Sequence, residues 1–345
     1  MLHDVWYAAC QAADVTTDPR MVTILDHPYV LYRSHANQLV AVDGYCPHRG
    51  CDLSIGHVDN GELVCPFHGW RFDKTGQCTR IPANRADTPI PKRFRLTTYP
   101  VLECSGMVWI YTGNQDINSS ELPTARSFAT FPELTDENWR GVPFQQTWKA
   151  HFTRVVESVI DVSHLPFVHP EVTGTDVDPT VDGPEYHVRE NVIVIHPTPF
   201  APSHPMEPVH PEQTSTAKSE IELRFPNQWI IRTPFGDHGM MCTFLTFTPI
   251  NDHVTQIFGL ALRNFDHDAP WLDDFHIDHT IRVMEEDQRI IESIRPKIAP
   301  FALRDECHVA SDVPTIRYRV MLANALEQQS TRRSSSTQIT CRGID

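Results

Sequence analysis

Short runs of alternating apolar and polar residues, each closed by turn-forming residues, fill the first third of the chain. The clearest runs are YVLYRS, QLVAVDG, GELVCPF and GMVWIYTG. Alternation with a period of two places successive side chains on opposite faces of a strand. These runs therefore predict a mostly β N-terminal domain.

The pattern changes after residues 112–135, a polar and turn-rich stretch that predicts a domain boundary. Beyond it, apolar residues at helical spacing predict helices over 148–165 and 271–295. Three strands are predicted between these helices, over residues 221–233, 240–250 and 255–265. The second part of the chain is therefore expected to mix a sheet with helices.

Two segments are expected to lack regular structure. Prolines are frequent over residues 166–211, and the run HPTPFAPSHPMEPVHP is the densest part, so we expect broken structure and a covering loop there. The polar tail QQSTRRSSSTQITCRGID is expected to be unstructured.

Composition and charge exclude several classes of function. A chain of 345 residues is long enough to bury two cores, and no apolar run approaches the roughly eighteen residues of a membrane span. The N-terminus shows no secretory signal pattern, which predicts a cytoplasmic protein with no membrane partner. A formal net charge of −15 argues against a nucleic-acid partner. The nine cysteines, an odd number, do not suggest a disulfide framework.

Four potential metal ligands lie in two short hooks, C-x-H at Cys46 and His48 and C-x-x-H at Cys65 and His68. Three interpretations compete: buried packing, a structural zinc site and a two-iron, two-sulfur centre. Zinc hooks usually have two or more residues between their ligands, whereas the first hook has one. In a [2Fe-2S] centre where two His replace two Cys, each hook gives one Cys to one iron and one His to the other. The proline and glycine in each hook favour this centre because they stiffen the loops and permit tight turns.

The segments CPHRG and CPFHGW resemble the signature of Rieske iron–sulfur domains. Respiratory members of that superfamily join their two cluster loops by a disulfide. This chain has Cys51 in the first loop but Phe67 where the partner is expected, so we expect no such disulfide and interpret Cys51 as a buried thiol. The resemblance therefore points to the oxygenase branch.

An oxygenase of this kind needs a second iron, and the segment WKAHFTRVVESVIDVSHLPFVHP holds candidate ligands. At helical spacing Glu157, Asp161 and His164 form one stripe of the predicted helix, and His169 follows the proline expected to end it. Non-haem Fe(II) oxygenases hold iron with two His and one carboxylate. The alternative is a solvated stripe in which Arg154 pairs with Glu157.

The carboxylate ligand is open at this point, because both Asp161 and Asp287 are candidates. Asp287 lies on the apolar stripe of the second predicted helix, where a buried carboxylate needs a compensating partner. That partner is either a metal ion or an arginine. Glu285 and Glu286 lie off the stripe and are expected to be solvated.

The spacing D-x2-H-x4-H that begins at Asp161 resembles the motif of Rieske oxygenase catalytic subunits. The resemblance implies that His164, His169 and Asp287 bind the mononuclear iron. It also implies that Asp161 is a catalytic residue that bridges toward the cluster of a neighbouring subunit instead of binding the metal.

The resemblance covers nearly the whole chain and implies an α+β fold. An all-β Rieske [2Fe-2S] domain is expected at residues 1–115, a START-like helix-grip catalytic domain at 116–328 and a flexible tail at 329–345. The single-subunit layout is similar to the phthalate-dioxygenase-type branch, which includes vanillate O-demethylase, dicamba monooxygenase and cyanobacterial alkaloid hydroxylases. Proteins of this type form head-to-tail homotrimers.

The resemblance also implies the cofactors and the reaction. Each chain is expected to hold one [2Fe-2S] Rieske cluster and one mononuclear Fe(II), with O2 as co-substrate. No flavin or nucleotide motif is present, so electrons are expected from an external flavin and iron–sulfur reductase, which alone uses NAD(P)H. The expected reaction is hydroxylation or oxidative demethylation of a small cyclic organic molecule by a monooxygenase.

Two further points bear on that reaction. Ring-hydroxylating dioxygenases often have Asn four residues before the bridging Asp, and Glu157 at this position argues against aromatic dihydroxylation. The alternative function is a Rieske-type electron-transfer protein without oxygenase activity. In such a protein the second domain would have no evident function. Candidate lining residues of a substrate pocket, which could equally be core, are Asn227, Trp229, Phe235, Met240 and Phe244.

Overall fold

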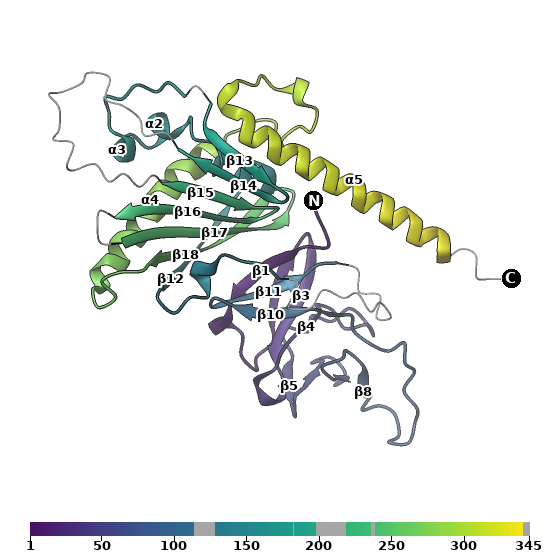
Figure 1. The fold of residues 1–345 in the computed structure, drawn as a ribbon. Helices are drawn as coiled ribbons and strands as arrows, with labels where there is room; N and C mark the ends of the chain where they lie inside the picture. Colours follow the sequence, from purple (N-terminus) through teal and green to yellow (C-terminus); the bar gives the residue numbers. More distant parts are fainter. Residues whose placement is uncertain (114–127, 182, 198–218, 236–238, 341–345) are drawn as a thin grey trace. The chain divides into compact units, whose positions relative to one another are not determined.

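The chain forms two compact units, which we describe from a computed structural model (Figure 1). The first unit is His3–Thr130, and the second comprises Met1–Leu2 and Phe131–Asp345. The described residues are 1–113, 128–181, 183–197, 219–235 and 239–340. The predicted domain boundary after residue 115 lies outside them.

The first unit is built from three antiparallel sheets, and its described residues form no α-helix. The sheet orders are β1-β11-β10, β2-β3-β4-β9 and β5-β6-β7-β8. The strands are β1 (Trp6–Gln11), β2 (Arg20–Ile24), β3 (His27–Arg33), β4 (Leu39–Asp43), β5 (His57–Asp59), β6 (Glu62–Val64), β7 (Arg71–Phe72), β8 (Cys78–Arg80), β9 (Thr98–Tyr99), β10 (Val101–Cys104) and β11 (Met107–Tyr111). The prediction of an all-β first domain is confirmed, and the four predicted runs correspond to β3, β4, β6 and β11.

The core of this unit reaches both hooks. Leu53, Leu63 and Phe72 are fully buried in one cluster that also contains Cys46 and Cys65. Burying a large apolar side chain contributes roughly 1.5–3 kcal/mol. The two thiols are therefore anchored in the core, which fixes the loops that carry them.

The second unit is built around a seven-stranded antiparallel sheet in the order β12-β18-β17-β16-β15-β14-β13. Its strands are β12 (Arg140–Trp148), β13 (Glu185–Arg189), β14 (Val192–His196), β15 (Glu220–Arg224), β16 (Gln228–Phe235), β17 (Gly239–Asn251) and β18 (Val254–Arg263). Helix α4 (Pro270–Ile291) packs against β12 and β18 (Figure 1). A large antiparallel sheet with helices against it confirms the predicted α+β class.

The predicted strands of this unit are mostly confirmed. The segments 240–250 and 255–265 correspond to β17 and β18. The segment 221–233 instead forms two strands, β15 and β16, joined by a turn at residues 225–227.

The helix predicted over residues 148–165 is shorter than expected, because α1 covers only Phe152–Ser158. Beyond it, the indole N–H of Trp229 donates to the carbonyl of Val159 at 2.9 Å. The carboxylate of Asp161 accepts a hydrogen bond from the Ser163 N–H at 2.8 Å. Side-chain hydrogen bonds of this kind compete with the helical ladder and favour a turn. The prediction that one helical stripe carries the candidate ligands was therefore wrong.

The proline-rich segment is more regular than predicted. Strands β13 and β14 lie within residues 166–211; they pair with each other, and β14 also pairs with β15. Pairing at the edge of a large sheet outweighs the local composition there. The densest proline run falls mostly within residues 198–218, outside the described residues.

The tail also differs from the prediction, because α5 (Val313–Thr340) continues through most of it. Its first turns bury Tyr318 and Leu322, and the helix packs against β14. Once packing has formed these turns, each further residue adds a backbone hydrogen bond at little cost. Neither α5 nor another helix in the described part of the chain is long and apolar enough to cross a membrane.

A buried ion cluster connects α1 to α5. Arg319 binds both carboxylate oxygens of Glu157, at 2.6 and 2.8 Å. Glu306 accepts from Arg154 at 2.7 Å and lies 2.6 Å from Arg319. The predicted contact of Arg154 with Glu157 exists at 3.6 Å, but both side chains are buried, so the stripe is not solvated.

Removing Arg319 should destabilise this unit. Arg319→Met leaves the Glu157 carboxylate buried with Arg154 3.6 Å away, and breaking a buried ion pair costs about 3–5 kcal/mol. We expect a loss of that size in the free energy of unfolding in urea. Arg282→Met is the control, because it removes an exposed ion pair with Glu171 and should cost less than about 1 kcal/mol. Equal losses in the two variants would contradict a special role for the buried cluster.

Candidate metal centres

Both hooks of the first unit contain the same backbone turn. The N–H of Gly50 donates to the Cys46 carbonyl at 2.8 Å, and the N–H of Gly69 donates to the Cys65 carbonyl at 2.9 Å. Both glycines have φ of +67°, a conformation that residues with a Cβ rarely adopt. The two hooks therefore present their side chains with matching geometry.

The thiols and the imidazoles of the hooks face different environments. Cys46 and Cys65 are 3% and 1% exposed, whereas His48 and His68 are exposed. The two imidazole rings lie 4.6 Å apart between centroids, and Trp70 stacks on His48 at 4.6 Å with an interplanar angle of 8°. The predicted cluster residues therefore converge, with sulfur ligands inside and imidazoles toward the surface.

The chemistry of the buried thiols fits an iron–sulfur centre. Burial raises the pKa of Cys46, a backbone hydrogen bond opposes this and the neighbouring Cys65 adds to it, so that the pKa is about 12. A thiol with no nearby positive charge stays protonated, but a bound metal ion removes the proton outright. The hook residues therefore fit a group that brings its own positive charge.

The third thiol near the hooks is a free one. Cys51 is only partly buried, which corrects the predicted buried thiol, and its Sγ lies 3.6 Å from the Asp52 carbonyl. Burial raises the pKa of Cys51, and so does its hydrogen bond with Cys65. Residue 67, where the disulfide partner of Cys51 is expected, is a phenylalanine that is 60% exposed.

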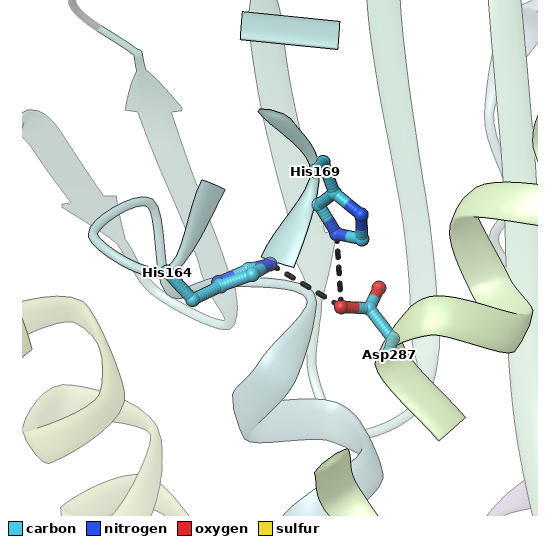
Figure 2. A group of neighbouring side chains, drawn as sticks. All are labelled: His164, His169 and Asp287. Atoms are coloured by element: carbon cyan, nitrogen blue, oxygen red, sulfur yellow. Dashed lines mark hydrogen bonds and ion pairs between the residues drawn. The ribbon is translucent and has the colours of Figure 1, made fainter. Parts of the chain in front are cut away.

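In the second unit the three predicted iron ligands lie together. The ligand atoms of His164, His169 and Asp287 all lie within 4.8 Å of one another (Figure 2). Asp287 Oδ1 lies 3.0 Å from the Nε2 of His169 and 3.4 Å from the Nε2 of His164. Ligand atoms about 2.1 Å from one ion and at right angles lie about 3 Å apart, so these spacings suit a shared metal ion.

A short helix sets the spacing of the two histidines. Helix α2 (Leu165–Val168) is a single turn with His164 immediately before it and His169 immediately after it. The proline at residue 166, predicted to end a helix, instead lies in the first turn of α2, where its missing N–H costs nothing. The two imidazoles therefore approach Asp287 from the two ends of one helical turn.

The Nδ1 atom of each imidazole contacts a carboxylate other than that of Asp287. Asp161 Oδ2 lies 3.2 Å from the Nδ1 of His164, and Glu286 Oε2 lies 2.7 Å from the Nδ1 of His169. When each Nδ1–H donates to its carboxylate, each Nε2 presents a lone pair toward Asp287. The donor set is therefore two Nε2 atoms and one carboxylate, which fits the two-His, one-carboxylate iron site.

The electrostatics of this site favour a cation. Burial lowers the pKa of His164, but hydrogen bonds to Asp161 and Asp287 outweigh it and raise the pKa to about 9. Burial likewise opposes ionisation of Asp287, and its two histidine partners reverse that and lower its pKa. Two imidazoles enclosed by three carboxylates therefore attract positive charge, which a metal ion supplies.

Three sequence interpretations change at this site. Glu286 was expected to be solvated but contacts His169, and no sequence signal other than its position beside Asp287 pointed to it. Glu157 turns toward Arg319 instead of joining the ligand stripe. Among the candidate lining residues, Phe244 packs on Phe131 at 5.8 Å between ring centroids.

Comparisons with known proteins agree with this arrangement. The chain is 32% identical to the 4β-methylsterol monooxygenase of Methylococcus capsulatus over 64% of this chain and 62% of that enzyme. It is 26% identical to the methylxanthine N1-demethylase NdmA of Pseudomonas putida over 94% of this chain and 90% of that protein. The chain spans about half the length of several other curated relatives.

A solved structure supports the fold. The crystal structure of dicamba monooxygenase bound to dicamba superposes with a TM-score of 0.77 at 21% identity, covering 96% of this chain and 99% of that one. At this level of identity the similarity establishes the fold alone. It supports the expected α+β fold.

The family patterns divide the chain in the same way. Residues 5–100 match the Rieske [2Fe-2S] domain. Residues 148–328 match the vanillate O-demethylase oxygenase C-terminal domain. Because this second match alone covers more than half of the chain, the protein belongs to the Rieske oxygenases whose catalytic domain is of the vanillate O-demethylase type.

Proposed function

We propose that the chain is the oxygenase component of a Rieske non-haem iron monooxygenase. The observation that carries the proposal is the meeting of His164, His169 and Asp287 in a unit that follows a Rieske domain. Each chain would hold one [2Fe-2S] cluster at the two hooks and one Fe(II) at the triad. A separate flavin and iron–sulfur reductase would supply electrons, because the sequence has no flavin or nucleotide motif of its own.

The proposed substrate class is a small cyclic organic molecule. Relatives of this chain are named as a methylsterol monooxygenase and a methylxanthine demethylase. Hydroxylation and oxidative demethylation begin with oxidation of the same kind of C–H bond and differ in whether the carbon is attached to O or N. The proposal covers both outcomes, and Glu157, held by Arg319, argues against aromatic dihydroxylation.

The residues of the chain prepare both centres for this reaction. When bound, the cluster supplies single electrons and the iron supplies O2-dependent oxidation of the substrate. Asp161 holds the imidazole of His164 by a hydrogen bond, and Ser163 fixes Asp161 in turn through its N–H and hydroxyl at 2.8 and 2.7 Å. His169, which is 1% exposed, is itself shielded from bulk water.

We further propose a head-to-tail homotrimer in which His68 of one chain lies beside Asp161 of the partner subunit. Large apolar side chains are exposed near both positions: Tyr45 and Phe67 at the hooks are 51% and 60% exposed, and Phe167 on α2 is 73% exposed. Large contiguous apolar patches mark interaction surfaces, and we propose that these side chains contribute to such patches. Heterologous contacts of this kind close into a ring, here a threefold one.

Iron counting separates the oxygenase from a Rieske electron carrier. We expect three irons and two acid-labile sulfides per chain, whereas an electron carrier would hold two irons. Cys65→Ser should lose the brown colour and the Rieske electron-spin signal but keep one iron, because a hydroxyl poorly replaces a cluster thiolate. Cys51→Ser is the matched control and should keep three irons. An unchanged visible spectrum in Cys65→Ser would remove the cluster assignment.

A second set of variants separates metal ligands from the bridging residue. His164→Ala, His169→Ala and Asp287→Ala should each lose the mononuclear iron and keep the cluster. Asp161→Asn should keep most of both metals yet lose most turnover, because an amide does not make the same charge-assisted hydrogen bond. Metal analysis and turnover of each purified variant provide the measurement. Iron loss in Asp161→Asn together with iron retention in Asp287→Ala would assign the third ligand to Asp161.

Mixed trimers test the proposed assembly. A cluster-deficient chain, Cys65→Ser, and an iron-deficient chain, His164→Ala, should each be inactive alone. When the two are co-expressed and mixed trimers are isolated, activity should return wherever an intact cluster lies beside an intact iron site across an interface. Stable mixed trimers that contain both centres but show no turnover would favour electron transfer within one chain.

A further inference from the structure

The imidazole of His169 is held between two consecutive carboxylates of α4. Its Nδ1 lies 2.7 Å from Glu286 Oε2, and its Nε2 lies 3.0 Å from Asp287 Oδ1. Consecutive helical side chains point about 100° apart, so this ring lies across the helix with one carboxylate at each nitrogen. His164 is held differently, because its orienting carboxylate, Asp161, comes from its own loop.

The burial of His169 makes its Nδ1 partner important. The residue is 1% exposed, so water cannot easily replace a lost hydrogen bond at Nδ1. An unsatisfied buried donor costs about 1–3 kcal/mol. A neutral imidazole would avoid that cost by moving the proton to Nε2, where Asp287 accepts it. That tautomer has no lone pair for a metal at Nε2.

Glu286 is available for this contact. Arg282, one turn before Glu286 on α4, pairs with Glu171 at 3.4 Å. Glu286 lines a cavity of about 210 Å³ together with His279, Arg282 and Glu171. Its side chain is 31% exposed, so one face can remain hydrated while Oε2 contacts His169.

We propose that Glu286 is a positioning residue that fixes the Nδ1–H tautomer and the orientation of His169 and thereby sets the affinity of the mononuclear site for its metal. The inference rests on the proposed function, since it assumes that His169 is a ligand. A carboxylate behind a ligating imidazole also increases the basicity of the ligand nitrogen. Helix α4 thus contributes one ligand, Asp287, and the orienting group of another.

Metal affinity tests the proposal without relying on turnover. The mononuclear metal would be removed from the cluster-containing trimer with a chelator and replaced by titration with Co(II) under argon. Loss of a partner behind a metal-binding His lowers metal affinity by about 10- to 100-fold. We expect Glu286→Ala to show a loss in that range and Glu286→Gln a smaller one, because an amide oxygen still accepts from Nδ1 but carries no charge.

Glu285→Gln is the matched control, because it makes the same change one residue earlier at an exposed position. Its Co(II) affinity should equal that of the wild type. The ligand-field absorption of bound Co(II) should shift in both Glu286 variants and not in this control. A purely structural role of Glu286 would lower the unfolding temperature of the metal-free protein without changing the Co(II) spectrum.

The outcomes distinguish this inference from the proposed function. If wild type binds Co(II) at the site, and Glu286→Ala and Glu286→Gln bind it within twofold of wild type with unchanged spectra, the inference is overturned and the iron site stands. If wild type and Asp287→Ala bind Co(II) alike, the iron site itself is wrong. Should Glu286→Ala fail to fold, Glu286→Gln with its Glu285→Gln control decides the question.

Discussion

The carboxylate of Asp287 between two imidazole nitrogens is the contact on which the arrangement of the second unit depends. A carboxylate that is 14% exposed in this position needs positive charge or hydrogen-bond donors, which His164 and His169 supply when both rings are protonated. They can do so only if α4 lies against the segment that follows α1. Since α4 also packs on β12 and β18, the same contact holds that segment over the sheet.

The segment that carries the histidines is shaped by side-chain contacts and not by a long helix. The indole N–H of Trp229 donates to the Val159 carbonyl, and the N–H of Ser163 donates to the Asp161 carboxylate. These two bonds replace helical ones at the point where the chain must leave α1. After the break, Asp161 Oδ2 lies 3.2 Å from the Nδ1 of His164.

Sequence patterns identified the candidate ligands better than the groups that contact their second nitrogens. The hooks at Cys46 and Cys65 were recognisable because ligand spacing is local and the turns need glycine at fixed offsets. Asp287 was recognisable because a carboxylate on the apolar stripe of a helix needs a partner that compensates for its burial. Glu286 lies off that stripe, and its partner is 117 positions away in the chain, so periodicity along α4 contained no information about the contact.

Other differences have the same origin in tertiary structure. Glu157 is consistent with a surface position when α1 is considered alone, but Arg319 contacts it from α5, a helix that the sequence patterns had not predicted. The strands β13 and β14 form in a proline-rich region because a sheet edge is available for pairing. In each case a partner distant in sequence outweighs a local preference.

The two candidate centres differ in burial, and the difference follows from the chemistry proposed for each. Electron exchange with a protein partner requires a centre near the surface, and the hooks keep their thiols in the core while His48 and His68 reach solvent. Oxidation of a bound substrate with O2 requires a site from which water is excluded. His169 at 1% exposure and Asp287 at 14% meet that requirement. Burial of His169 in turn explains why its imidazole needs a carboxylate at the second nitrogen, because water has little access to the ring.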